Sequence, residues 1–164
     1  MKSKIVIVDE KDNVIGYKDR DAVKQEDIYR VSALWITNDK GDILLARRSL
    51  TKSHDPGKWG PAVAGTVEQE EDYLTNICKE AEEEIGLKGI VPQAGPKERI
   101  SGKYNYFVKR YLIKINKPEA EFVINKDEVE EIKWFKTEEL LQAIRVNPDN
   151  FLNSTRKWIE IFCQ

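Results

Sequence analysis

The chain has 164 residues, of which 34% are charged and 40% are hydrophobic, a balance typical of one soluble domain with a buried core. Its 27 basic and 29 acidic residues give a formal net charge of −2, which indicates neither a nucleic-acid partner nor an acidic membrane surface. Apolar runs are short, so we expect no transmembrane helix and no secretory leader.

The two cysteines, Cys78 and Cys163, lie far apart in the sequence and form no CxxC pair. They therefore predict neither a disulfide framework nor a zinc site. We expect a reduced, cytoplasmic protein with a single domain over residues 1–164.

The first predicted elements in the chain are two hairpins. Apolar runs at 5–8 and 14–17 flank the polar turn DEKDN and form a hairpin within an N-terminal extension of residues 1–28. A short polar helix or turn follows, and residues 30–50 form a second hairpin around the turn NDKG. Prolines and glycines indicate a loop over residues 51–61.

The later elements alternate irregularly between strands and helices. The predicted strands are 62–67, 104–115 and 130–135, and the predicted helices are 73–85, 136–145 and 154–162. Most neighbouring strands are joined as hairpins, which favours an α/β fold in which helices pack on a mixed sheet.

The helix over 73–85 has an apolar face and an acidic face. At about 100° per residue, the residues that share the apolar face are Leu74, Ile77, Cys78, Ala81 and Ile85. Glu80, Glu83 and Glu84 share a neighbouring stripe, with Glu84 nearest the apolar edge. Gly86 ends the helix.

These glutamates occupy an unfavourable position, because they repel one another and lie near the negative end of the helix dipole. A solvated surface helix is one interpretation. The other is a bound divalent cation that compensates the acidic charge. Ligands that are all oxygen suit Mg²⁺, with Mn²⁺ as a second candidate, and do not suit zinc.

Residues 65–87 resemble the Nudix box. The positions that match are Gly65, Glu71, Glu80, Ala81, Glu83, Glu84, Gly86 and Leu87, with the spacing of the motif complete. Lys79 stands where the family has arginine, and Ala64 stands where many members have glycine. The N-terminal residues are also similar to the extra hairpin of isopentenyl-diphosphate isomerase-like Nudix proteins.

This resemblance implies an α/β/α sandwich around a mixed sheet, with an extra N-terminal hairpin. It also implies a hydrolase that cleaves the pyrophosphate linkage of a nucleoside diphosphate joined to another group. The expected partner is a small-molecule diphosphate, with no nucleic acid and no membrane. The sequence does not indicate an oligomeric state.

The resemblance assigns roles to residues of the box. Glu80, Glu83 and Glu84 would be the catalytic metal ligands, although Glu80 could instead help to activate water. The main-chain carbonyl of Ala64 would add a ligand, and Glu71 would support the cluster. In the family, the arginine at the position of Lys79 directs a box glutamate, and a lysine keeps its charge without its bidentate geometry.

Candidates outside the box come from strand ends and loops. The general base could be Glu98, Glu128 or Glu130, and the sequence does not choose among them. Arg48 would face the substrate or solvent, whereas Arg47 would point to the opposite face of a regular strand.

Aromatic residues supply further candidates for substrate binding. Trp59 would stack on a base or belong to the core. Tyr104 and Tyr106, placed on one face of a strand, would line the far wall together with Arg110.

Two other classes of function compete with a hydrolase. Because Lys79 replaces the arginine of the family, one alternative is a nucleotide-binding module with weak or no turnover. An isopentenyl-diphosphate isomerase would need a set of histidines and a cysteine beside the box. The chain has one histidine, His54, and Tyr29 stands where a histidine would be expected. The segment PAVAG holds no cysteine, and Cys78 is assigned to the buried helix face.

Overall fold

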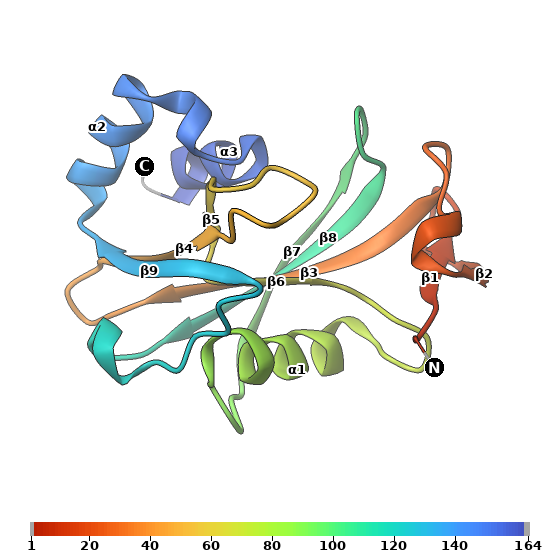
Figure 1. Cartoon of the computed structure of the whole chain (residues 1–164), viewed down its shortest axis with the longest axis horizontal. Helices are drawn as coiled ribbons and strands as arrows, with labels where there is room; N and C mark the ends of the chain where they lie inside the picture. Colours follow the sequence, from red (N-terminus) through yellow and green to blue (C-terminus); the bar gives the residue numbers. More distant parts are fainter. Residues whose placement is uncertain (1, 163–164) are drawn as a thin grey trace.

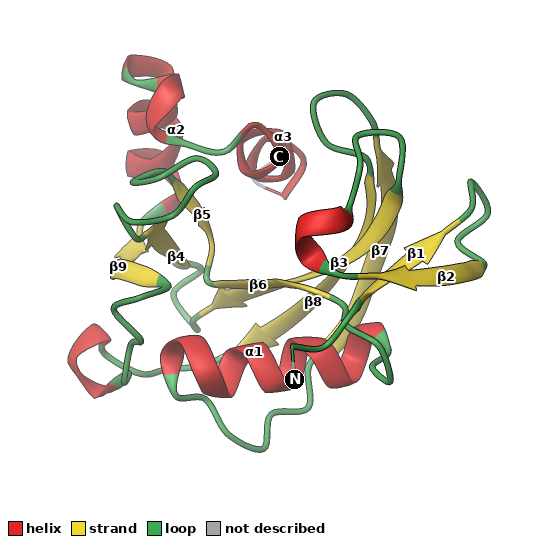
Figure 2. Ribbon diagram, turned by 45° about the vertical axis from the view of Figure 1, so that its right-hand side comes forward, coloured by secondary structure: helices red, strands yellow, loops and turns green. Residues whose placement is uncertain are grey.

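A computed structural model of the protein describes residues 2–162 and contains one mixed sheet with helices on both faces (Figure 1). Helix α1 (Tyr73–Ile85) covers one face, and α2 (Thr137–Val146) and α3 (Asn153–Phe162) lie on the other (Figure 2). The predicted α/β/α sandwich is therefore confirmed. No helix in the described part of the chain is both long enough and apolar enough to cross a membrane.

The long strand β3 organises the sheet. The strands are β1 (Ile5–Val8), β2 (Val14–Lys18), β3 (Ile28–Thr37), β4 (Ile43–Arg48), β5 (Trp59–Pro61), β6 (Val63–Thr66), β7 (Gln93–Ile100), β8 (Tyr106–Lys114) and β9 (Val129–Phe135). β3 pairs in parallel with β8 and antiparallel with β1, β4 and β6. Three short 3₁₀ helices, η1 (Arg20–Ala22), η2 (Glu119–Glu121) and η3 (Pro148–Asn150), lie in the connections.

Alternating side chains of β3 build a core on each face of the sheet. Leu34 and Ile36 pack with Ile77 under α1, whereas Trp35 packs with Leu140 and Ile159 under α2 and α3. This alternation follows from the two-residue period of a strand. The central strand is therefore buried on both faces and holds the elements of the site in fixed positions.

The predicted hairpins at the N-terminus are confirmed. β1 pairs with β2 and β3 pairs with β4, each antiparallel. The turn of the first hairpin is held by Asp12, whose carboxylate accepts hydrogen bonds from Arg30 Nε (2.7 Å), Tyr73 Oη (3.0 Å) and Lys97 Nζ (2.8 Å). These contacts fix the extension to β3, α1 and β7.

Helix α1 has the bounds that the sequence predicts. Asp72 caps its first turn through Thr75, and Gly86 ends it with a φ of 72°, a conformation that glycine adopts without strain. The prediction that Leu74 lies on the buried face is wrong. Leu74 is 45% exposed, and the first buried residues of the helix are Asn76 and Ile77.

Three other predictions need correction or completion. The single strand expected over 62–67 is preceded by a separate short strand, β5, inside the expected loop. β7 was not expected, because its residues QAGPKERI are mostly polar and include Gly95 and Pro96. β8 begins at Tyr106, so Tyr104 lies in the preceding loop and does not share a strand face with Tyr106. Cys163 lies outside the described residues.

Candidate active site

The acidic residues at the end of α1 differ sharply in their exposure. Glu84 is buried, with 9% of its surface exposed, and the Glu80 side chain is 16% exposed. Glu83 is exposed. Glu82 points into solvent, as expected, and lies 3.7 Å from Lys88.

Burial and repulsion act on Glu84. Burial raises the pKa of Glu84 well above its usual value, and the charges of Glu80 and Glu128 raise it further. Lys52 and the main-chain N–H of Ala64 lower this pKa by smaller amounts. The N–H of Ala64 therefore faces Glu84, and its carbonyl lies on the same edge of β6, because both groups of a strand residue point to one side.

Glu80 is a second carboxylate whose charged form is disfavoured by its surroundings. Burial raises its pKa to about 7, the charge of Lys79 lowers it, and the charges of Glu83, Glu71 and Glu68 raise it again. Gly65 makes room for this side chain: a Cβ atom on Gly65 would lie 2.5 Å from Glu80 Cγ and Cδ. The glycine that opens the box therefore allows Glu80 to lie against β6.

The raised pKa values predict how the stability of the metal-free protein depends on pH. A carboxyl group with a raised folded-state pKa stabilises the fold below its unfolded pKa, and this stability is lost as the pH rises through the folded value. The carboxylates with lowered pKa values have already ionised in this window. From about pH 5.5 to about pH 8, the free energy of unfolding should fall by about 2 kcal/mol.

Thermal unfolding in a chelating buffer across this pH range measures the effect. Glu80→Gln should make the curve shallower, since one of the two carboxyl groups with a raised pKa is gone. A wild-type curve that is already flat would contradict the assigned environment of Glu80.

Lys79 lies among three carboxylates. Its Nζ atom forms an ion pair with Glu71 and lies 3.1 Å from Glu68 Oε2 and 3.8 Å from Glu80 Oε1. Burial lowers the pKa of Lys79, but its hydrogen bonds to Glu71 and Glu68 outweigh burial and raise it. Lys79 is therefore charged, and it links the start of the box to Glu80.

We expect turnover to follow the order Arg at least equal to Lys, and both above Ala, at position 79. A guanidinium can hold a carboxylate with two hydrogen bonds, whereas Lys79→Ala removes the cation that offsets the acidic stripe. The alanine variant should need about 10- to 100-fold more Mg²⁺ for half-maximal activity. Mg²⁺ titrations of the three proteins measure this order, and an arginine variant clearly worse than wild type would show that the site is built around the shorter ammonium.

Asn76 is a buried residue of the site that the sequence did not single out. Its Nδ2 atom donates to Glu71 Oε2 (2.9 Å) and to the Thr66 carbonyl (3.1 Å), and its Oδ1 atom accepts a hydrogen bond from Ser32. These bonds fix Glu71, which the box motif had suggested as a supporting residue. A polar residue between the apolar positions of an amphipathic helix is the signal that could have found Asn76.

The loop before β9 brings Glu128 to the same place. Asn125 donates its N–H to the carbonyl of Glu84 (2.9 Å), which pins this loop to the last turn of α1. Ser49 donates its N–H to the carbonyl of Glu128 (3.1 Å), and Lys52 forms an ion pair with the Glu128 carboxylate. Glu128 is therefore held beside Glu84 from two directions.

The other two candidate bases lie elsewhere. Glu98 accepts hydrogen bonds from Arg110 (2.9 Å) and Lys157 (2.7 Å), on the face covered by α3. Glu130 is a residue of β9, and only its main-chain carbonyl takes part in a described contact, with Lys126. Of the three, Glu128 alone shares a cavity with Glu84.

This cavity, of about 80 Å³, has basic and acidic residues in its wall. The charged residues that line it are Arg47, Arg48, Lys52, Glu84 and Glu128. Arg47 and Arg48 both belong to its lining, and the register of β4 and β9 shifts between them, so the alternation expected of a regular strand does not apply here. A space of this size suits a phosphate group or ordered water and leaves the rest of a nucleotide outside.

Arg48 connects the cavity to two loops. Its Nε atom donates to the carbonyl of His54 (3.0 Å), and the His54 ring lies 3.0 Å from Tyr104 Oη through Nδ1. The predicted binding residues Arg48 and Tyr104 are thus joined through His54. Whether they bind substrate stays a prediction.

The remaining aromatic candidates have structural contacts. Trp59 packs edge-on against Phe135 with ring centroids 5.1 Å apart, which supports its core role. Tyr106 stacks on Tyr29, and the buried Arg110 forms an ion pair with the half-buried Glu98. These contacts lie apart from Glu84, and a substrate role for Trp59 remains a prediction.

The candidate ligand atoms are all carboxylate or carbonyl oxygens, which hard divalent cations such as Mg²⁺ prefer. Across residues 2–162, no three histidine, cysteine, aspartate or glutamate side chains are grouped closely enough to hold a metal ion as they stand. Yet the buried Glu84 has no described lysine or arginine within ion-pair distance. Burying an unpaired carboxylate is costly, and a cation held by Glu84, Glu80 and the Ala64 carbonyl would remove that cost.

Comparisons with known proteins agree with the geometry. The family model described as NUDIX domain matches residues 28–158, beginning where β3 begins. The chain is 30% identical to the Nudix hydrolase YfcD of Escherichia coli (strain K12) over 94% of this chain and 85% of that protein. It is 22% identical to an isopentenyl-diphosphate Delta-isomerase of Aliivibrio fischeri (strain MJ11), over 92% and 90% of the two chains. The solved structure of DR0079 from Deinococcus radiodurans superposes with a TM-score of 0.73 at 25% identity, covering 87% of this chain and 89% of that one.

Proposed function

The chain belongs to the Nudix hydrolase family, and from this membership we propose that it is a Mg²⁺-dependent hydrolase of a nucleoside diphosphate joined to another group. The observation that carries this proposal is the buried carboxylate of Glu84 near the end of a Nudix box with complete spacing, in one cavity with Arg48, Lys52 and Glu128.

Charged residues in and beside the cavity have tasks in this reaction. Arg48 and Lys52 would offset the negative charge of the diphosphate, and Glu80, Glu83 and Glu84 would hold the metal with the Ala64 carbonyl. Mg²⁺ supplies further neutralisation of phosphate charge and favours ionisation of the attacking water. Mn²⁺ would meet the same oxygen donors.

Glu128 takes the proton in this proposal. The water oxygen forms a bond to one phosphorus, the bond from that phosphorus to the bridging oxygen breaks, and the bridging oxygen leaves with the electron pair. The water proton passes to the Glu128 carboxylate, which Lys52 orients. Two phosphate-bearing products result.

An isomerase activity has less support, although a relative that matches over most of both chains carries that name. The single histidine, His54, contacts Tyr104 and lies in the loop before β5. Cys78 lies on α1, and burial raises the pKa of its thiol, which makes it a poor acid at neutral pH. The chain thus lacks the histidine and cysteine set that the isomerase chemistry would require.

A panel of substrates tests the proposal against a nucleotide-binding module. Product release should be measured with and without Mg²⁺ for NDP-sugars, dinucleoside polyphosphates, NADH, ADP-ribose and (d)NTPs. Hydrolysis of at least one class, abolished by chelation, is expected. Binding of a nucleotide without hydrolysis of any panel member would favour the binding module.

A further inference from the structure

Strand β2 lies at one edge of the sheet (Figures 1 and 2) and carries exposed apolar side chains. Of the eight large apolar side chains that are exposed in the described part of the chain, three belong to this strand: Val14 (45%), Ile15 (66%) and Tyr17 (46%). No charged residue and no proline interrupts Val14–Tyr17. Edge strands of soluble proteins usually carry such residues, which prevent pairing with another chain. In β2 the only charged residue is Lys18 at its end, where it is paired with Asp27, so the rest of this edge is a candidate interface.

The free edge has a defined hydrogen-bonding pattern. Val6 donates its N–H to the Val67 carbonyl on the far side of β1, so Ile5 and Ile7 are the residues whose main chain faces β2. Their partners in β2 are Lys18 and Gly16. By alternation, the main-chain groups of Tyr17 face outward and are available to another strand.

The hairpin is held rigidly, which favours association. The carboxylate of Asp12 accepts hydrogen bonds from three different elements, β3, α1 and β7. A strand that is already ordered loses little conformational entropy when it pairs.

We propose that β2 pairs antiparallel with β2 of a second copy of this chain, with a two-fold axis at Gly16. In this register, Ile15 lies opposite the partner's Tyr17, and the Tyr17 main chain forms hydrogen bonds across the interface. A β-branched residue opposite an aromatic one is a favourable cross-strand pair. An antiparallel pair is self-complementary, as a two-fold axis requires.

Glycine is suited to the axis position. The two Gly16 residues would form a pair without mutual hydrogen bonds, in which Cα atoms approach to about 4.5 Å. No atom of the chain lies within 4 Å of the place where a Gly16 Cβ would stand. The face of the sheet at Gly16 is therefore uncovered, so a residue introduced there would meet no atom of its own chain.

Charges beyond the strand agree with this register. Antiparallel pairing about Gly16 brings the hairpin turn of one copy beside η1 of the other. Lys11 in the turn and Asp21 in η1 are exposed, have opposite charges, and form no ion pair with any described residue. They would pair twice in a symmetric dimer.

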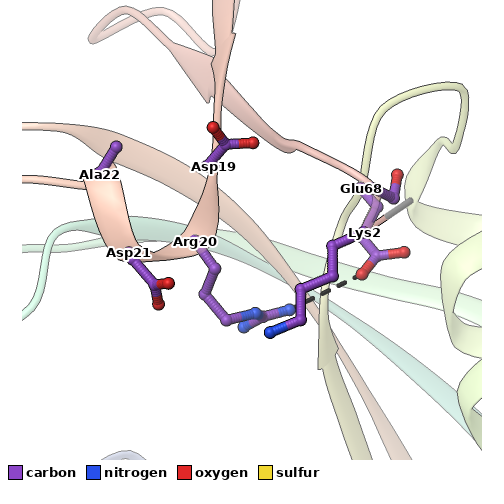
Figure 3. Close-up of a pocket in the computed structure, with 7 residues that line it drawn as sticks. Lys2, Asp19, Arg20, Asp21, Ala22 and Glu68 are labelled. Atoms are coloured by element: carbon purple, nitrogen blue, oxygen red, sulfur yellow. Dashed lines mark ion pairs between the residues drawn. The ribbon is translucent and has the colours of Figure 1, made fainter.

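A hollow of about 570 Å³ lies beside η1 (Figure 3). Its walls come from Lys2 and Ser3, from η1 and the residue before it, and from Glu68. Arg20 crosses it toward Glu68 at 3.7 Å. Its lining holds the carboxylates of Asp19, Asp21 and Glu68 against the cations of Lys2 and Arg20, so in this register the partner's Lys11 would meet Asp21 at a wall with an excess of acidic charge.

Sedimentation and light scattering over a range of protein concentrations test the proposal. The wild type should be a dimer, and Ile15→Lys should raise the dimer dissociation constant by at least about ten-fold, since a charge on an edge opposes pairing. Val91→Lys is the matched control, because Val91 is 90% exposed on another surface. A wild-type protein that stays monomeric, or equal dimerisation of the two variants, would overturn the proposal.

Two further experiments fix the register. Lys11→Glu and Asp21→Lys should each weaken the dimer, and the double variant should restore it. Under oxidation, Gly16→Cys should form a covalent dimer much faster than Val91→Cys, because the two axis residues are close enough for a disulfide. Equal cross-linking of both cysteine variants would reject the axis at Gly16. Hydrolysis should be unaffected in all of them, so the outcome is independent of the proposed activity.

Discussion

Replacing Glu84 by glutamine should lower hydrolysis by about 100-fold or more while the fold survives. Glu84 is the most buried carboxylate of the acidic stripe, and no described cation pairs with it. Its charge is costly to the metal-free protein and useful only when a cation binds. The variant should therefore be as stable as the wild type without metal, or more stable, because repulsion from Glu80 and Glu128 is relieved.

The matched control for this variant is Glu82→Gln. Glu82 lies two residues away on the same helix, its side chain is 54% exposed, and its nearest cation is Lys88. Its replacement should leave turnover within about two-fold of wild type, as surface changes usually do. Initial rates at limiting Mg²⁺ measure both proteins. Wild-type turnover in Glu84→Gln would remove Glu84 from the metal site.

Glu128→Gln should also lower turnover by about 100-fold or more, but for a different reason. Glutamine keeps the shape of the side chain and cannot accept the water proton. The variant loses the ion pair with Lys52, but the main-chain hydrogen bonds from Ser49 to residue 128 and from Asn125 to Glu84 do not involve this side chain, so the loop should keep its place. The stabilisation by Mg²⁺ should therefore persist in this variant, unlike in Glu84→Gln.

Glu130→Gln serves as the control for Glu128. Glu128 comes directly before β9 and Glu130 is the second residue of that strand, but only Glu128 lines the cavity with Glu84. The rate of the Glu130 variant should equal that of the wild type. If the Glu130 variant is the slower of the two, the proton acceptor has been placed on the wrong residue.

Local sequence signals predicted the elements that carry the box. The spacing of the apolar residues in α1 gave its buried face from Ile77 onward, and Gly86 marked its end. The alternating strands and the NDKG turn gave the β3–β4 hairpin. These features depend on residues near one another in the chain, so a sequence pattern is enough to find them.

Features that depend on distant residues could not be read in this way. The irregularity between Arg47 and Arg48 arises in the pairing of β4 with β9, and β7 is an edge strand whose polar residues carry no strand pattern. The choice of Glu128 among three candidates depends on the contact between its loop and the end of α1. The mostly buried environment of Glu80 depends on the absence of a side chain at Gly65.

The central claim is that Mg²⁺ binds at the acidic edge of α1, and thermal unfolding with and without Mg²⁺ tests it most directly. A ligand that binds only the folded state stabilises it, by about 2.7 kcal/mol at a concentration 100-fold above its dissociation constant. Mg²⁺ should therefore raise the Tm of the wild type by several degrees, and Glu83→Gln/Glu84→Gln should lose most of that increase. An equal increase in the wild type and the double variant would place the metal elsewhere and contradict the account.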